Sequence, residues 1–199
     1  MSHLNPLLLE DTGDLQPTLT AIERSAGFAP NSLLTMARKP EIVRGFLALF
    51  NAVFRESNEV PAELKALVTH VASRASGCRY CWAHTGATSL AQGVSPDRLE
   101  TVFDFERSRL FTPAERAALR VAAAAGVSPN AVSAADMTEL SRYWSDGQVV
   151  EIVAAIATFG FLNRWNDTLA TELEPHPLGI GQEHLAKDGW NAGKHAPPS

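Results

Sequence analysis

Two cysteines three residues apart are the residues best suited to chemistry in this chain. Cys78 and Cys81 are its only cysteines, and His84 completes a Cys-x-x-Cys-x-x-His pattern. Because Gly77 interrupts a helical pattern directly before Cys78, we expect a new helix to begin at this cysteine. Unpaired amides and the positive end of the helix dipole favour a thiolate there. The two sulfurs then lie within reach of a disulfide, and His84 can exchange a proton with a thiolate.

Other interpretations of this pattern stay open on the residues alone. A structural zinc site would need two further ligands, and the sequence has no second Cys-x-x-Cys and no His-x-x-x-His. The two thiols could also be inert core residues. A thioredoxin-like fold would need a βαβ unit, of which the neighbouring sequence gives no sign. We favour redox-active thiols, while His84 could still be a surface or capping histidine.

Two residues before the cysteines are candidates to assist them. His70 and Glu63 are separated by seven residues, which places them on the same face of one expected helix. A histidine oriented by this glutamate and pointing at the thiols would accept a proton. The alternatives are a buried histidine bonded to a backbone carbonyl and a glutamate that only complements the helix dipole.

Helical patterns cover most of the chain. It contains 30 Ala and 22 Leu against 13 Val and 5 Ile, a usage that favours helix over strand. No segment shows the sustained alternation of a strand, so we predict an all-α protein with at least seven helices. Pro, Ser, Thr and Gly mark most of their boundaries. The expected helices cover residues 17–26, 31–39, 41–56, 61–76, 78–92, 95–105, 112–126, 133–143 and 146–173.

These elements suggest a helical domain with an extension at each end. We expect a helical lead-in over residues 1–40, a helical domain over 41–174 and an irregular C-terminal arm over 175–199. The long apolar helix over 146–173 is expected to be central and buried. A Pro-Ala-Glu motif at Pro61 recurs at Pro113, and we leave open whether the two mark a duplicated helical unit. The fold would then be two helical lobes around the long closing helix.

Length and charge limit the possible classes of protein. The 199 residues are enough for one domain or two small packed lobes. A net charge of −5 gives no sign of a surface for nucleic acid or anionic membranes. The longest apolar stretch, residues 149–162, is too short to span a bilayer, and residues 1–13 lack the pattern of a secretory signal. We therefore expect a cytoplasmic protein without nucleic-acid or membrane partners.

Residues 67–84, LVTHVASRASGCRYCWAH, resemble the core of the alkylhydroperoxidase D and carboxymuconolactone decarboxylase superfamily, in particular its peroxidase-related branch. The resemblance extends over about residues 41–173. It implies an all-helical fold, self-association and reduction of hydroperoxides by the cysteine pair with no metal, haem or other cofactor. By this resemblance Cys81 attacks the peroxide and becomes a sulfenic acid, and Cys78 resolves it to a disulfide. A thioredoxin-type or lipoyl-type dithiol would then reduce the pair, with Tyr80 and Thr85 as supporting residues.

Two departures from the family pattern affect the proton transfer. The prototype has its histidine at the position of Thr85, and its relay glutamate at the position of Ala66. We therefore predict that His70 takes over the role of the missing glutamate. The rival functions are a dithiol redox sensor or reductase partner without peroxide turnover, a decarboxylase and a helical assembly module with a vestigial pair. The decarboxylases of the superfamily do not depend on this pair, which argues against that activity.

Overall fold

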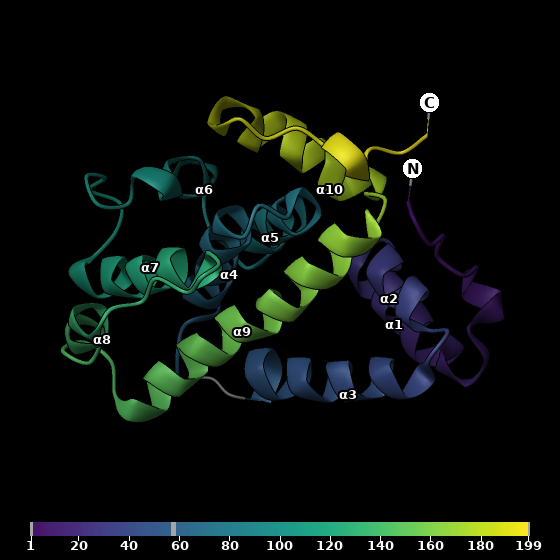
Figure 1. Cartoon of the computed structure of the whole chain (residues 1–199), viewed down its shortest axis with the longest axis horizontal. Coiled ribbons are helices and arrows are strands. Elements are labelled where there is room, and N and C mark those ends of the chain that lie inside the picture. Colours follow the sequence, from purple (N-terminus) through teal and green to yellow (C-terminus); the bar gives the residue numbers. More distant parts are fainter. Residues whose placement is uncertain (1, 57–58, 199) are drawn as a thin grey trace.

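The computed structural model describes residues 2–56 and 59–198, and it is built from helices (Figure 1). None of the described residues lies in a strand, which confirms the all-α prediction. The α-helices are α1 (Gln16–Ala26), α2 (Asn31–Met36), α3 (Pro40–Asn51), α4 (Ala62–Ala75), α5 (Arg79–Ala91), α6 (Pro96–Thr101), α7 (Pro113–Gly126), α8 (Ala134–Leu140), α9 (Asp146–Leu169) and α10 (Pro175–Ile180). Short 3-10 and π segments are η1 (Leu9–Leu15), η2 (Ala52–Glu56), η3 (Val102–Asp104), η4 (Gly181–Leu185), η5 (Ala186–Asp188) and η6 (Gly193–His195).

Side-chain capping explains why several helices begin where the sequence predicted. Ser95 accepts a hydrogen bond from the backbone of Arg98 and so caps α6, which has proline in its first turn. Thr112, Ser133 and Ser145 each form a reciprocal capping box at the start of α7, α8 and α9. These bonds satisfy amides that the helices leave unpaired, so local sequence alone sets these boundaries.

The buried apolar residues form two clusters. The larger cluster includes Leu67 of α4 and Ile152 of α9, together with residues of α5 and α7. The smaller cluster includes Leu19 of α1 and Val43 of α3. Leu162 of α9 packs against both. In the structure α3 therefore shares a core with the lead-in, although the predicted domain boundary places this helix with the residues that follow it.

Helix α9 crosses the molecule diagonally between the two clusters (Figure 1). It begins at Asp146, as predicted, but ends at Leu169 because Ala170 adopts a left-handed conformation with φ of 49°. Ile152 and Ala155 are fully buried, whereas Val150 is 67% exposed. The helix is therefore buried on one side only, whereas its apolar composition predicts a central, buried helix. Within the described part of the chain, no helix is long and apolar enough to cross a membrane.

The C-terminal arm is more regular than the sequence suggested. It forms α10, η4, η5 and η6, of which α10, η4 and η6 contact α5, whereas the sequence predicts an irregular segment. The Trp190 indole donates a hydrogen bond to the carbonyl of Arg79 at 3.0 Å, and the backbone N–H of Leu173 donates to the carbonyl of His195 at 2.9 Å. Proline and glycine do break the periodicity here, but tertiary contacts hold the short helical turns in place. The arm therefore becomes a wall of the region around the cysteines.

Candidate active site

A turn at Gly77 delivers the first cysteine to the start of α5. Helix α4 ends at Ala75, and Gly77 then adopts φ of 79°, a conformation that side chains disfavour. Cys78 follows as the N-cap of α5, and its Sγ accepts the backbone N–H of Cys81 at 3.4 Å. The predicted helix start is confirmed. The unpaired amides at this helix end and its positive dipole favour a negatively charged sulfur at Cys78.

Both cysteines are free thiols inside the protein. Cys78 is 0% exposed and Cys81 is 1% exposed. Burial raises the pKa of the Cys81 thiol well above its ordinary value, and the neighbouring Cys78 raises it further. The Asn166 side-chain amide acts in the opposite direction, because it donates a hydrogen bond to Cys81 Sγ at 3.4 Å. On balance these contacts favour the neutral thiol at Cys81 in the reduced pair.

A buried carboxylate that the sequence did not predict holds His84 and Tyr80. Glu174 lies directly before α10 and is 5% exposed. Its Oε2 lies 2.6 Å from His84 Nε2, and its Oε1 accepts the Tyr80 hydroxyl at 2.8 Å. The backbone N–H of Asn31 adds a third donor at 2.5 Å. The Tyr80 and His84 rings stack with centroids 4.2 Å apart. Glu174 thus occupies the place of a histidine-orienting carboxylate, a role that we had predicted for Glu63.

The ionisation of this group is set by its hydrogen bonds. Burial alone would raise the pKa of the Glu174 carboxyl, but the charge of His84 and the donors around it outweigh burial, and the pKa is lowered. Burial and the Glu174 charge raise the pKa of the Tyr80 hydroxyl well above its ordinary value. Glu174 is therefore ionised and Tyr80 neutral near neutral pH. The pair can hold the His84 ring in one orientation.

His70 lies in the interior rather than in an acid-base arrangement with Glu63. Its Nδ1 lies 3.0 Å from the hydroxyl oxygen of Thr85, and its ring stacks on Phe103 with centroids 5.3 Å apart. Burial and the charge of Arg74 lower the pKa of His70 to about 3. A histidine with so low a pKa is a weak proton acceptor near neutral pH. The relay role of His70 stays a prediction, and this environment argues against it.

The structure shows Glu63 paired with a residue other than His70, so no observed contact supports the prediction that it orients this histidine. The Glu63 carboxylate is 44% exposed and forms an ion pair with Arg98 at 2.9 Å. Seven residues correspond to about 10 Å of rise along a helix, farther than a glutamate side chain reaches to an imidazole. Sharing a helix face therefore did not bring the two side chains into contact.

Thr85 supports the first turn of α5 from within. Its hydroxyl donates to the carbonyl of Cys81 at 2.7 Å. Because the hydroxyl has a single proton and uses it in that bond, the Thr85 oxygen acts as the acceptor, and His70 Nδ1 as the donor, in the contact between these two residues. Thr85 therefore connects His70 to the backbone of the cysteine turn, and the described contacts give it no direct bond to either sulfur.

Sequence reasoning missed both Glu174 and Asn166. Each comes from a segment far along the chain from the cysteines, and each reaches them through packing of α9 and the arm against α5. Asn31 of α2 was likewise not predicted to contribute. No local pattern marks these contacts; the nearest signals are the polar residues that follow the apolar part of α9 and the proline after Glu174.

Comparisons with known proteins agree with this fold. The sequence model of the carboxymuconolactone decarboxylase family matches residues 40–124. The crystal structure of the debrominase Bmp8 is 34% identical, covers 90% of this chain and 96% of its own, and superposes with a TM-score of 0.84. A cysteine-to-alanine variant of Bmp8, crystallised with 2,3,4-tribromopyrrole, matches equally well.

Two further relatives are less similar. The alkylhydroperoxidase AhpD core of a peroxidase-related protein from Ralstonia eutropha JMP134 has a TM-score of 0.76 at 23% identity, over 87% of this chain and 94% of its own. At that identity the likeness concerns the fold. The uncharacterized protein YnjA of Escherichia coli K12 is 28% identical over 115 residues, which are 58% of this chain and 63% of YnjA.

Proposed function

Because the chain belongs to the carboxymuconolactone decarboxylase family, we propose that it is an oxidoreductase that reduces hydroperoxides with Cys78 and Cys81. The observation that carries this proposal is the position of both sulfurs on the first turn of α5, with the Cys81 amide directed at Cys78 Sγ. A dithiol at a helix start can supply two electrons and close to a disulfide. Inert core thiols would need no such placement.

In a single turnover, the two thiols supply both electrons that reduce the hydroperoxide. A thiolate attacks the terminal peroxide oxygen, the O–O bond breaks, and the departing alkoxide takes up a proton to become an alcohol. The resulting sulfenic acid is attacked by the second thiol, which releases water and forms the disulfide. An external dithiol then returns two electrons. His84, held by Glu174 one turn after Cys81, is positioned to relay protons to and from this turn.

We assign the attack to Cys78 and the resolving step to Cys81. This reverses the order that the family resemblance implies, because Cys78 Sγ accepts the backbone N–H of Cys81 at the start of the helix, whereas burial raises the pKa of the Cys81 thiol. Trapping experiments separate the two orders. Under this assignment Cys81→Ser retains a sulfenic acid at Cys78 after peroxide treatment, and Cys78→Ser consumes no peroxide. The opposite pattern would restore Cys81 as the attacking sulfur.

Reductive dehalogenation is a second candidate function. It is favoured by the similarity to Bmp8, which is named a debrominase and binds 2,3,4-tribromopyrrole as a cysteine variant. The same dithiol could reduce an aryl bromide: the C–Br bond breaks, carbon takes up a proton, bromide leaves and the cysteines form a disulfide. Both functions consume two thiols and differ only in the atom that is attacked.

One single-turnover experiment distinguishes the candidates. The reduced protein is mixed separately with hydrogen peroxide, cumene hydroperoxide and a polybrominated pyrrole, and free thiols and released bromide are measured over time. Peroxide reduction predicts loss of two thiols with the hydroperoxides, and dehalogenation predicts one bromide per disulfide with the pyrrole. The Cys78→Ser/Cys81→Ser double variant is the control. Slow oxidation by every substrate would instead indicate a redox sensor or an assembly module.

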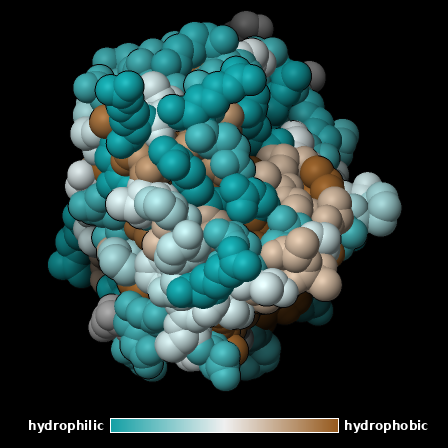
Figure 2. All heavy atoms as spheres, turned by 90° about the vertical axis from the view of Figure 1, so that its left-hand side faces the viewer, coloured by the Kyte–Doolittle hydropathy of each residue, from teal (hydrophilic) through white to brown (hydrophobic). Residues whose placement is uncertain are grey.

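We also propose that the protein works as a homo-oligomer. Apolar side chains remain exposed on α3 and α9, including Leu49 at 48%, Val150 at 67% and Phe161 at 42%. On the face seen in Figure 2, hydrophilic residues surround an apolar area near the right-hand edge. Association of copies would remove such surfaces from water. A monomer of 21.4 kDa at all concentrations in sedimentation would contradict this proposal.

The remaining partners follow from the chemistry. A disulfide formed in each cycle needs a dithiol reductant, of the thioredoxin or lipoyl type. A thiol enzyme that depends on such a reductant fits a reducing compartment, and we propose a cytoplasmic location.

A further inference from the structure

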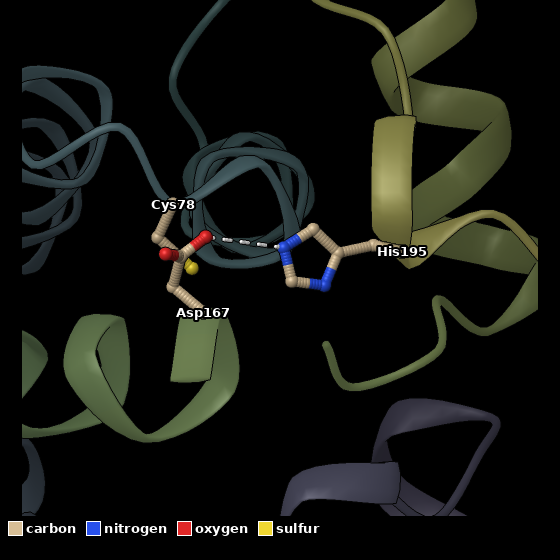
Figure 3. Close-up of side chains that lie close together, drawn as sticks. All are labelled: Cys78, Asp167 and His195. Atoms are coloured by element: carbon tan, nitrogen blue, oxygen red, sulfur yellow. Dashed lines mark ion pairs between the residues drawn. The ribbon is translucent and has the colours of Figure 1, made fainter. Parts of the chain in front are cut away.

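A second group of possible metal-binding atoms lies close to Cys78 Sγ and comes from segments that are distant in the sequence. Cys78 Sγ, a carboxylate oxygen of Asp167 and a ring nitrogen of His195 all lie within 4.8 Å of one another (Figure 3). Cys78 caps α5, Asp167 belongs to the last turns of α9, and His195 ends η6. Packing of the arm against α5 and α9 therefore brings together three residues that no sequence motif connects.

The His195 ring is oriented with one nitrogen directed into this group. Its Nδ1 lies 2.7 Å from the carbonyl oxygen of Thr171, which can only accept a hydrogen bond, so the proton of the neutral ring sits on Nδ1. Nε2 then presents a lone pair. The side chain is 1% exposed, and among the described residues Nε2 has no hydrogen-bond partner. A backbone carbonyl that fixes the tautomer of a histidine is the usual arrangement behind a metal ligand.

Three electron-rich atoms meet here within 4.8 Å of one another. His195 Nε2 lies 3.6 Å from Asp167 Oδ1, which is longer than a hydrogen bond. Such a group attracts a cation, and Lys194 already places its ammonium 2.9 Å from the same carboxylate oxygen. Lys194 is 48% exposed, so its flexible side chain can move into solvent when another cation arrives.

We propose that the reduced protein binds a zinc ion through Cys78 Sγ, the Asp167 carboxylate and His195 Nε2. Thiolate, imidazole and carboxylate are the three ligand types that zinc uses in proteins. Tetrahedral coordination at zinc bond lengths places neighbouring ligand atoms roughly 3.3–3.6 Å apart. The 3.6 Å between Nε2 and Oδ1 is already close to that separation. With three protein ligands, the fourth position is left to water.

The surroundings of the three residues offer a route for the ion. A cavity of about 310 Å³ reaches Asp167 and His195 from the surface. It is lined by Gly77, Arg79, Asp167, Gly193, Lys194 and His195. A candidate metal site requires access from solvent and support behind its ligands, and the cavity and Thr171 supply these two features.

Zinc binding would compete with oxidation of the cysteine pair. On binding, Cys78 releases its thiol proton to solvent and its sulfur bonds the metal. The same sulfur is then unable to attack a substrate or to form the disulfide with Cys81. Zinc would thus protect the reduced protein and inhibit its reaction, and this consequence, unlike the binding itself, rests on the proposed function.

Metal titration of the reduced protein tests the site without reference to turnover. Zinc is titrated in competition with a chromophoric chelator, and Co²⁺ is used to detect thiolate-to-metal absorption. We expect one equivalent to bind the reduced protein and none to bind the disulfide form. Second-sphere changes typically cost 10- to 100-fold in metal affinity, so loss of a ligand in Cys78→Ser or His195→Ala should cost at least roughly 100-fold.

Matched variants distinguish this site from unspecific binding. His184→Ala removes a histidine that instead contacts Glu100, and it should leave affinity unchanged. Lys194→Ala removes the competing ammonium and should tighten binding. Asp167→Asn alters a half-exposed side chain and serves if His195→Ala does not fold. Equal affinity in His195→Ala and His184→Ala, retained binding in Cys78→Ser, or no binding at all would overturn the site.

The outcome for zinc is separable from that for the proposed function. If zinc binds as expected but neither hydroperoxide nor bromopyrrole oxidises the thiols, the proposed function fails and the metal site stands. If the thiols are oxidised but no zinc binds, only the metal site fails. If both hold, stoichiometric zinc should suppress thiol oxidation, and a chelator should restore it.

Discussion

Replacing Glu174 with glutamine tests whether the carboxylate behind His84 contributes to the reaction of the thiols. The substitution keeps the size of the side chain and an oxygen that can accept from Tyr80 and Asn31. It removes the negative charge that faces His84 Nε2 at 2.6 Å. The carboxylate is 5% exposed and the imidazole 17% exposed, so solvent screens this interaction only weakly.

The expected loss follows from the strength of this one bond. A hydrogen bond to a charged group contributes about 1.5–3 kcal/mol, and about 1.4 kcal/mol on a barrier changes a rate tenfold. If the whole of this interaction energy is present in the transition state for proton transfer, Glu174→Gln should slow oxidation of the two cysteines roughly 10- to 150-fold. The fold should be retained, because the three donors around residue 174 keep an oxygen acceptor nearby.

Stopped-flow oxidation of the reduced protein by whichever substrate proves active measures this effect. The matched control is Glu172→Gln, which makes the same charge change two residues earlier in the chain. Near-UV circular dichroism checks that both variants remain folded. Equal rates for Glu174→Gln and the wild type would remove Glu174 from the proton transfer and reduce it to a packing role.

The same variant makes a prediction for stability against pH. The pKa of Glu174 in the fold lies below its ordinary value of 4.5, because His84, Asn31 and Tyr80 stabilise the ionised form despite burial. Its ionisation therefore stabilises the folded protein above pH 4.5, and this contribution is lost as the pH falls through the lowered pKa. Urea unfolding should show a wild-type advantage over Glu174→Gln that is constant near neutral pH and shrinks in acid. An advantage independent of pH down to the lowered pKa would contradict this reasoning.

Three further predictions concern other parts of the chain. Mild oxidation should remove two hydrogens from the intact mass through a Cys78–Cys81 disulfide, whereas exclusively intermolecular dimers would exclude the resolving step. Because the pKa of His70 is about 3 in the fold, the unfolded chain binds more protons than the folded one between about pH 6.5 and 3. The free energy of unfolding should therefore fall across this window on acidification. His70→Asn should flatten that fall and leave the pH profile of thiol oxidation unchanged near neutrality. Lys65 and Glu151 form a buried ion pair 2.7 Å apart, so Lys65→Met should lower the free energy of unfolding in urea by about 3–5 kcal/mol. The Lys65→Met/Glu151→Leu double variant should recover much of this loss, and equal losses in both variants would contradict the prediction.

The parts of the site that the sequence predicted are those that depend on local physics. The start of α5 at Cys78 follows from Gly77, which turns the chain, and from amides that every helix leaves unpaired at its start. The partner of His84 could not be predicted in this way, since Glu174 reaches it only through the packing of the arm. Helix periodicity predicted that Glu63 and His70 share a helix face but not how far apart they lie, and Glu63 pairs with Arg98 instead. Local patterns thus place a residue on its element, while contacts between distant elements decide its neighbours.

The stretch at Leu173 and Glu174 contacts two histidines near the cysteine turn, His84 and His195. Glu174 holds His84, and the residue before it, Leu173, donates its backbone N–H to the carbonyl of His195. The same short stretch therefore supplies the carboxylate that contacts His84 and a backbone bond to His195. A displacement of this stretch would move both the carboxylate that contacts His84 and the backbone N–H that bonds His195, so we expect it to disturb both residues. Binding of an ion at Cys78 that tightens the arm should then also immobilise the Glu174 carboxylate, although the ion touches neither Glu174 nor His84.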